Sequence, residues 1–261
     1  MKKDNFLYTF AKQIFKFVFP SRLVKSTRLF IDLYSGKFAY SEDCLYTYVH
    51  ADFLTDQKFM DAYKKGHALM LPSWGDYQFR WRAYIVCWVA EHVRALEGEF
   101  VECGVNTGML ARMIIDYINF PSTGKQFYLL DTYEGMAAEY SSQDEMQRSK
   151  HMGYGRDIYE QVKETFASFN VRVIKGVVPD TLQQITAEKI CFLSIDMNSA
   201  IPERKALEYF WDKLVSGGVV VLDDYGFPGH EEQKRNHDEF AKSLGVQVLA
   251  LPTGQGLIFK P

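Results

Sequence analysis

The pattern of apolar and polar positions is clearest over residues 99–112. An apolar run, Phe100 to Cys103, meets Gly104 and Gly108 and is followed by apolar residues at helical spacing over 109–118. A short continuous apolar run is typical of a buried strand, and the glycines indicate a loop before the helix. This stretch therefore predicts the first half of a nucleotide-binding βαβ unit.

The same alternation continues toward the C-terminus. Further apolar runs predict buried strands near 126–131, 171–175, 190–196 and 217–223, and helical spacing predicts helices near 156–168, 180–186, 202–214 and 229–243. Two last runs, 246–251 and 256–260, are joined by Pro-Thr-Gly-Gln-Gly and predict a hairpin. Continuous apolar strands separated by helices are typical of a parallel sheet covered on both faces. We expect an α/β fold, a Rossmann-like doubly wound and mostly parallel sheet with an antiparallel C-terminal hairpin.

The N-terminal part of the chain is less regular. Residues 30–75 are aromatic and irregular, apart from a helix expected over 56–69 with a stop near Pro72. A longer helix, about 77–96, leads into the opening strand. We therefore divide the chain into a helical, basic and aromatic N-terminal cap, residues 1–75, and a nucleotide-binding domain, residues 76–261.

A basic amphipathic helix is predicted at the start of the chain. Residues 5–19 place apolar side chains on one helical stripe opposite Lys12 and Lys16, and Pro20 ends the segment. Such a helix can lie on an anionic membrane surface, or its stripe can pack on the domain or on a second subunit. We favour packing and expect a homo-oligomer, and a peripheral membrane contact stays open.

Composition limits the classes of partner and the cellular compartment that we expect. The net charge of −3 gives no general attraction to nucleic acid, so we expect no nucleic-acid partner. The cysteines, 44, 87, 103 and 191, show no Cys-x-x-Cys spacing, which favours free thiols in a reducing compartment. Lysines interrupt the first apolar segment, which disfavours a secretory signal, and no apolar run approaches the roughly 20 residues of a membrane span. We expect a cytoplasmic protein.

Acidic residues follow four of the five expected parallel strands. In open α/β sheets, ligands bind outside the carboxyl ends of the strands. The acids at these ends are Glu102, Asp131, Asp196 and the pair Asp223 and Asp224. Aspartate also favours turns, so a structural role is open for each of them. Their coincidence at one edge favours a binding site.

The opening loop reads Glu-x-Gly-x-x-x-Gly, from Glu102 to Gly108. It lacks the Gly-x-Gly-x-x-Gly spacing that brings a helix N-terminus to a pyrophosphate, which disfavours a nicotinamide oxidoreductase. An acid in the loop repels phosphate but suits a ligand with an ammonium and a sulfonium. Asp131, at the end of the second strand, is placed to accept hydrogen bonds from ribose hydroxyls. S-adenosylmethionine meets both requirements.

A divalent cation is the second expected ligand. Asp196 and Asp223 end strands that should be neighbours, about 4.8 Å apart, so their carboxylates can share an ion. Asp224 can join them only where the strand has already become a loop, because successive strand residues face opposite ways. A set of carboxylates favours Mg²⁺ over zinc. The alternative is an Asp-Asp turn that enters a helix and holds no metal.

Five motifs together resemble the macrocin O-methyltransferase family. They are Val-Glu-Cys-Gly-Val-Asn-Thr-Gly (101–108), Leu-Leu-Asp-Thr-Tyr-Glu-Gly-Met (129–136), Gly-Val-Val-Pro-Asp-Thr-Leu (176–182), Ser-Ile-Asp-Met (194–197) and Gly-Gly-Val-Val-Val-Leu-Asp-Asp-Tyr-Gly (217–226). The resemblance covers about 95–245 and extends to the cap only loosely. It implies an S-adenosylmethionine-dependent, Mg²⁺-requiring enzyme that methylates sugar hydroxyls of antibiotics and related glycosides.

The resemblance also assigns roles to residues. It implies that the cofactor is held by the first two motifs and flanked at the adenine by the third, that is by Glu102, Gly104, Asn106, Gly108, Asp131, Thr132, Val177 and Asp180. It implies that the metal is held by Asp196, Asp223 and Asp224. The family usually reads Asp-x-Asp-Leu-Tyr after the fourth strand, whereas this chain reads Asp-Met-Asn-Ser-Ala over 196–200. This departure concerns the substrate pocket and the proton acceptor.

Methyl transfer to an alcohol needs a base, because an alcohol is a poor nucleophile until its proton is being removed. Asp196 is the first candidate because it lies at the expected metal, and His230 is the second because the ordinary pKa of histidine suits the task. The departure at 196–200 leaves an alternative open, a methyltransferase-fold binding module without catalytic activity. The sequence does not identify the acceptor.

Overall fold

The structure is a computed structural model that describes residue 27, residue 29, residues 31–32, 35–151 and 155–261. The chain divides into two compact units at Ala51 and Asp52. In the first unit, β1 (Tyr40–Glu42) and β2 (Leu45–Thr47) form an antiparallel hairpin. The amphipathic helix expected over 5–19 lies outside the described residues.

The second unit, Asp52–Pro261, contains a seven-stranded sheet in the order β5-β4-β3-β6-β7-β9-β8. Five strands run parallel, β3 (Glu99–Cys103), β4 (Phe127–Asp131), β5 (Val171–Lys175), β6 (Ile190–Ile195) and β7 (Leu214–Leu222). The last two, β8 (Leu249–Ala250) and β9 (Gly256–Phe259), pair antiparallel and close the β7 edge. The expected doubly wound parallel sheet with its C-terminal hairpin is therefore confirmed.

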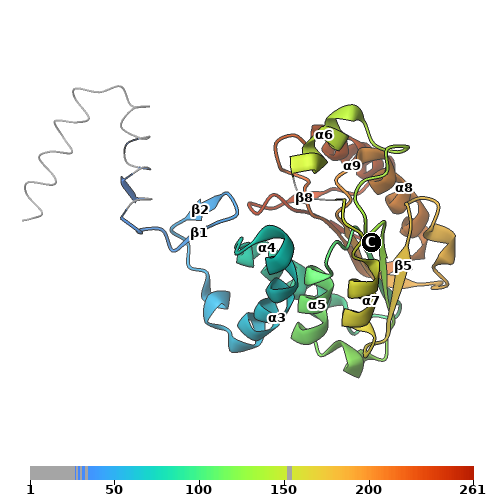
Figure 1. Cartoon of the computed structure of the whole chain (residues 1–261), viewed down its shortest axis with the longest axis horizontal. Coiled ribbons are helices and arrows are strands. Elements are labelled where there is room, and N and C mark those ends of the chain that lie inside the picture. Colours follow the sequence, from blue (N-terminus) through green and yellow to red (C-terminus); the bar gives the residue numbers. More distant parts are fainter. Residues whose placement is uncertain (1–26, 28, 30, 33–34, 152–154) are drawn as a thin grey trace, which may run out of the picture. The chain divides into compact units, whose positions relative to one another are not determined.

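Helices cover both faces of this sheet (Figure 1). The α-helices of this unit are α3 (Gln57–Trp74), α4 (Arg80–Val93), α5 (Met109–Tyr117), α6 (Gln143–His151), α7 (Tyr159–Phe166), α8 (Ala200–Phe210) and α9 (Glu231–Ser243). Short 3₁₀ helices are η1 (Asp52–Thr55), η2 (Phe120–Thr123), η3 (Leu182–Gln184) and η4 (Trp211–Lys213). None of the helices in the described part of the chain has the length and apolar character that a membrane crossing requires.

Two expectations about helices need correction. The helix expected over 180–186 is the single 3₁₀ turn η3. Helix α6 was not expected, because its polar sequence lacks an apolar stripe. It begins with a capping box instead: the Ser142 hydroxyl accepts from the Glu145 backbone N–H at 3.3 Å, and the Glu145 carboxylate accepts from the Ser142 N–H at 2.7 Å.

The two faces of the sheet have separate cores. Strand β6 is buried along its whole length, as a central parallel strand requires. On one face, Phe100, Phe127 and Phe192 pack together with Phe120 of η2, and the rings of Phe100 and Phe192 stack at 4.9 Å. On the other face, residues of α8 and α9 join the aliphatic side chains of β3, β6 and β7. The sheet is thereby fixed from both sides, and only its edges and strand ends are left for function.

Helix α3 belongs to the sheet-containing unit, although the sequence division put it in the cap. It packs along α5, so the compact unit begins at Asp52 rather than after residue 75 (Figure 1). It also continues through Pro72 to Trp74, past the end expected at 69. A proline in the last turn removes one helical hydrogen bond and leaves the rest of the helix intact.

The contact between α3 and α5 depends on Gly66. A Cβ atom on this residue would lie 2.4 Å from the Met109 carbonyl oxygen and 2.4 Å from Met113 Cγ. Alanine normally stabilises a helix by about 1 kcal/mol relative to glycine. Here, that gain is outweighed, because overpacking against backbone costs roughly 1–3 kcal/mol.

We therefore expect Gly66→Ala to destabilise the protein by about 1–2 kcal/mol, which corresponds to a fall of roughly 2–8 °C in melting temperature. Differential scanning calorimetry measures this shift. Lys64→Ala, on the exposed side of the same helix, is the matched control and should change stability by less than about 0.5 kcal/mol. A Gly66→Ala protein as stable as the wild type would refute the tight helix contact.

Candidate functional site

The carboxyl ends of the parallel strands meet along one edge of the sheet. The backbone hydrogen bonds continue one residue past the strands: the Asp223 N–H donates to Ile195 O at 3.1 Å, and the Asp196 N–H donates to Cys103 O at 2.8 Å. The Gly104 N–H likewise donates to Leu130 O at 2.9 Å. The expected strand-end residues therefore form a continuous row along this edge.

The opening loop is anchored by Asp131. One carboxylate oxygen, Oδ2, accepts the backbone N–H groups of Val105 at 2.6 Å and Asn106 at 2.8 Å. The other, Oδ1, accepts the Tyr133 N–H at 2.7 Å and the Thr132 hydroxyl at 3.3 Å. Asp131 thus holds the loop, and the ribose contact expected for it stays a prediction.

Gly104 brings this loop against the end of β6. Its φ of +88° lies in the left-handed region, and a Cβ atom would lie 1.8 Å from the Asp196 carbonyl oxygen. Only glycine permits this approach. The loop after β3 and the acid after β6 are therefore in backbone contact.

Several polar atoms around the loop are buried without a partner. Glu102 Oε2, Thr107 Oγ1 and Ser194 Oγ make no hydrogen bond, and each of these residues is at most 2% exposed. Burial, together with the charges of Asp131 and Asp223, raises the pKa of the Glu102 carboxyl well above its usual value. Glu102 and Ser194 are in register on β3 and β6, so their side chains share a face of the sheet. An unpartnered buried carboxylate fits a cationic ligand such as an ammonium group.

The other residues assigned to the cofactor lie in the same region. Asn106 has a φ of +50°, and Gly108, at +82°, is the N-cap of α5. Val177 and Asp180 follow β5, which pairs with β4. The Asp180 carboxylate is exposed and accepts the Tyr140 hydroxyl at 3.0 Å.

Asp196, Asp223 and Asp224 form an acid cluster. One oxygen of each lies within 4.8 Å of the others, and among the described residues this is the group that the geometry singles out as able to hold a metal. Strand β7 ends at Leu222 and a turn begins at Asp223, which is the condition for Asp224 to face the same point as Asp223. Burial, and then the charges of Asp223 and Asp224, raises the pKa of the Asp196 carboxyl well above its usual value.

The donor set fits a hard divalent cation. Opposite oxygens around Mg²⁺ are about 4.2 Å apart, twice a bond of 2.0–2.1 Å, so a span of up to 4.8 Å needs only a small contraction. Carboxylate oxygens are the ligands that such ions prefer. Asp196, Asp223 and Asp224 are therefore the residues that would hold the metal.

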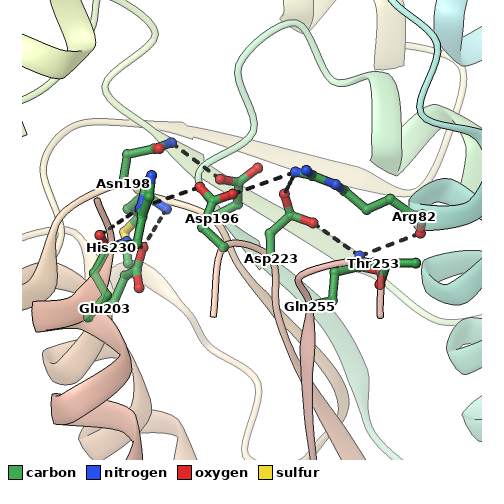
Figure 2. A network of polar contacts seen from close by, with 11 residues as sticks. Arg82, Asp196, Asn198, Glu203, Asp223, His230, Thr253 and Gln255 are labelled. Carbon is green, nitrogen blue, oxygen red and sulfur yellow. Dashed lines mark hydrogen bonds and ion pairs between the residues drawn. The ribbon is translucent and has the colours of Figure 1, made fainter. Parts of the chain in front are cut away.

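Arg82 and Gln255 contact this cluster and were not predicted from the sequence. Arg82 Nη1 lies 2.7 Å from Asp223 Oδ2 and 3.6 Å from Asp224 Oδ1 (Figure 2). Gln255 Nε2 donates to Asp223 Oδ1 at 3.1 Å, and Thr253 Oγ1 donates to Gln255 Oε1 at 3.0 Å. Both carboxylate oxygens of Asp223 therefore already accept from side chains of the protein.

His230 lies at the other side of the acid cluster, opposite Arg82 (Figure 2). Its Nδ1 is 3.8 Å from Asp224 Oδ2 and 2.8 Å from Gln233 Oε1. Gln233 Nε2 donates to Glu203 Oε1 at 2.9 Å, so its oxygen is left as an acceptor for the Nδ1 proton of His230. Burial lowers the pKa of His230, which favours the neutral ring with its acceptor lone pair on Nε2.

Asn198 stands where the resemblance leads us to expect a second acid. It adopts a φ of +57°, which asparagine tolerates, and its Nδ2 donates to Asp196 Oδ1 at 3.3 Å. Its Oδ1 is buried without a hydrogen-bond partner. Next to it, the Ala200 N–H donates to Glu145 Oε1 at 2.8 Å, so α6 is tied to the start of α8. The altered segment is therefore an ordered part of the site.

Solved structures with the same fold are methyltransferases. The O-methyltransferase NovP superposes with a TM-score of 0.61 and 16% identity, covering 80% of this chain and 98% of that chain. The calicheamicin methyltransferase CalS11 superposes with a TM-score of 0.58 and 13% identity, covering 81% of this chain and 94% of that chain. At these identities, the likeness shows the fold alone.

A sequence relative is known from Streptomyces olivaceus. It is 8-demethyl-8-(2,3-dimethoxy-alpha-L-rhamnosyl)-tetracenomycin-C 4'-O-methyltransferase, 27% identical over 140 residues, which are 49% of this chain. The chain spans about half the length of this relative, since the match covers 53% of it. The sequence model of the macrocin-O-methyltransferase (TylF) family matches residues 81–248, which include the opening loop and all three acids. The chain therefore belongs to the macrocin O-methyltransferase family.

Proposed function

We propose that this protein is an S-adenosylmethionine-dependent, Mg²⁺-requiring O-methyltransferase that acts on a hydroxyl group of a sugar or a glycosylated natural product. The observation that carries the proposal is the backbone contact between Gly104 and Asp196. Because of it, a ligand held by the opening loop would lie beside the acid cluster. A methyl donor and an acceptor oxygen need this proximity, since in-line transfer requires the reacting atoms to be roughly 3–3.5 Å apart.

The donor half of the site is supported by Glu102 and the loop. The buried, unpartnered Glu102 oxygen suits the ammonium of S-adenosylmethionine, and Asp131 fixes the loop that would surround the cofactor. When bound, S-adenosylmethionine supplies an activated methyl group on its sulfonium. Asn106, Gly108, Thr132, Val177 and Asp180 are the remaining residues that we assign to its binding.

The acceptor half is supported by the acid cluster. When held by Asp196, Asp223 and Asp224, Mg²⁺ supplies a Lewis acid that lowers the pKa of an acceptor hydroxyl. Asp196 is our candidate base, because its carboxylate belongs to the proposed metal cluster and its backbone adjoins the opening loop. His230 is the second candidate, through the lone pair on Nε2. The Gln233 and Glu203 side chains orient the ring for this role.

The acceptor class rests on the family and on the named relative. The family resemblance implies methylation of sugar hydroxyls of antibiotics and related glycosides. The Streptomyces olivaceus relative is named as a 4'-O-methyltransferase of a rhamnosyl tetracenomycin. We further propose a cytoplasmic location, supported by four free cysteines. Homo-oligomerisation and the contact made by the N-terminal helix stay predictions.

Mass spectrometry of a pool of glycosides and free sugars tests the proposal. Incubation with the protein, S-adenosylmethionine and Mg²⁺ should add one methyl group, about 14 Da, to an acceptor and yield S-adenosylhomocysteine in equal amount, as an in-line transfer requires. Tight cofactor binding without methylation of any acceptor would instead favour the non-catalytic binding module.

Glu102 generates a prediction about pH. Its raised pKa means that, without ligand, the carboxyl keeps its proton to a higher pH than an ordinary glutamate, whereas an ammonium stabilises the ionised form. S-adenosylmethionine binding should therefore release protons and should tighten as pH rises through the raised pKa. Isothermal titration calorimetry in two buffers of different protonation enthalpy measures this release.

Glu102→Gln should abolish the proton release and weaken cofactor binding by roughly 10–100-fold, the value of a charge-assisted hydrogen bond. Glu97→Gln, an exposed acid before the same strand, is the control and should bind like the wild type. Equal heats in both buffers and an unchanged Kd for Glu102→Gln would contradict the assignment.

The acid cluster generates a prediction about activity. Asp223→Asn and Asp224→Asn should each lower kcat by at least about 100-fold, because loss of a Lewis acid removes several kcal/mol of transition-state stabilisation. Cofactor affinity should change by less than about threefold, since Glu102 and the loop are retained. EDTA should inhibit the wild type, and added Mg²⁺ should restore it.

Asp212→Asn is the matched control, because this exposed acid lies just before β7, at the opposite end of the strand. It should leave kcat and the Mg²⁺ requirement unchanged. Full activity of Asp223→Asn, or of the wild type in EDTA, would remove the metal from the mechanism.

A further inference from the structure

Arg82 is the part of the site that the proposed chemistry does not use. Its guanidinium approaches the acid cluster from the start of α4, with Nη1 between Asp223 Oδ2 at 2.7 Å and Asp224 Oδ1 at 3.6 Å (Figure 2). The side chain is 15% exposed, and its Cζ lies 4.5 Å from the centre of the Phe227 ring. A guanidinium stays charged in proteins. Arg82 therefore places a permanent positive charge beside the acid cluster.

The surrounding residues hold Arg82 in place. Gln255 Nε2 lies 3.4 Å from the Arg82 carbonyl oxygen and donates to Asp223 Oδ1 at 3.1 Å. One amide thus joins the backbone of α4 to the carboxylate that the guanidinium contacts. The guanidinium packs over the Phe227 ring, where a cation–π attraction helps to hold it.

Arg82 and a divalent cation would draw on the same carboxylates. A metal shared by the three acids needs oxygens of Asp223 and Asp224 that point to a common centre, and Arg82 Nη1 already contacts one oxygen of each. The two cations also repel each other at this range. A metal that binds these carboxylates would therefore compete with the ion pairs of Arg82.

The net charge of the cluster also indicates that Arg82 weakens metal binding. When all three carboxylates are ionised they carry −3, and Arg82 reduces this to −2, the charge that one divalent cation neutralises. The affinity of an oxygen site for a divalent cation depends on the number of charges around it. Without the guanidinium, the same three acids would attract the ion more strongly.

We propose that Arg82 is an internal competitor of the metal, which lowers the affinity of the acid cluster for divalent cations. The inference rests on the metal role in the proposed function. In this role, Arg82 acts through the acids and does not touch a substrate. In the absence of metal, its charge neutralises part of the charge of Asp223 and Asp224. When a metal binds, the guanidinium would release these carboxylates. The protein would therefore bind divalent cations more weakly than three clustered aspartates alone would.

Direct binding of Mn²⁺, followed by electron paramagnetic resonance of the full-length protein at pH 8, tests this proposal. Arg82→Gln keeps a hydrogen-bond donor but removes the charge, and it should bind Mn²⁺ at least about tenfold more tightly than the wild type. Arg82→Lys keeps the charge and should stay within about threefold of the wild type. Arg94→Gln removes the same charge at the far end of α4 and should bind like the wild type.

Thermal unfolding provides a second readout. Without metal, Arg82→Gln should melt below the wild type, because three clustered carboxylates are left without their cation, and Mn²⁺ should raise its melting temperature by more than that of the wild type. Arg82→Met keeps a long, unbranched apolar side chain at this position and serves as the neutral variant if Arg82→Gln does not fold.

The outcomes separate this inference from the proposed function. Equal or weaker Mn²⁺ binding by the neutral variants, with clear binding by the wild type, overturns the competition and leaves the metal role intact. Absence of Mn²⁺ binding in the wild type and in all variants overturns both the competition and the metal role. Calorimetric titration with S-adenosylmethionine then reports separately whether the donor half is functional.

Discussion

The site depends on one backbone contact, the approach of Gly104 to the carbonyl of Asp196. Strands β3 and β6 are hydrogen-bonded neighbours, although Gly104 and Asp196 lie 92 positions apart in the sequence. Their hydrogen-bond ladder continues past the strand ends to the Asp196 N–H, which donates to Cys103 O. A side chain at Gly104 would force the strand ends apart. This contact therefore sets the distance between the loop that would hold a methyl donor and the carboxylates that would bind an acceptor.

Burial of acids is the main energetic cost of this arrangement. Glu102, Asp196 and Asp223 lie close together at one edge, and removing charged groups from water is unfavourable unless they are paired. Asp223 is paired with Arg82 and Gln255, whereas the Glu102 oxygen has no partner. The raised pKa values of Glu102 and Asp196 reflect the same cost. Cationic ligands at both places would relieve it, so binding and stability are coupled here.

The sequence predicts most of the sheet and the acids at its edge, but not the side chains that contact those acids. Continuous apolar runs identify β3 to β7, because central parallel strands are buried on both faces. The acids at the strand ends are predictable because parallel strands share a carboxyl edge. Helix α6 was missed because its polar sequence is held by the contacts of Glu145 rather than by an apolar stripe.

Arg82 and Gln255 were missed because they reach the acids from outside the parallel strands. Topology nevertheless offers a signal for both. A helix that leads into a parallel strand begins at the carboxyl edge, which is where the start of α4 brings Arg82. An antiparallel strand beside β7 also begins there, since Gly256 pairs with Leu222, and Gln255 directly precedes it. Their side-chain contacts, however, are tertiary and follow from packing alone.

The close packing of Gly66 also affects the residues that the family model matches. The carbonyl that Gly66 approaches belongs to Met109, the first residue of α5, directly after the opening loop. Helix α3 therefore packs against the residue that directly follows the loop. It lies, however, before residues 81–248, which the family model matches. In this chain, the region that the family model matches is therefore packed against a helix that precedes it, at the residue that directly follows the opening loop.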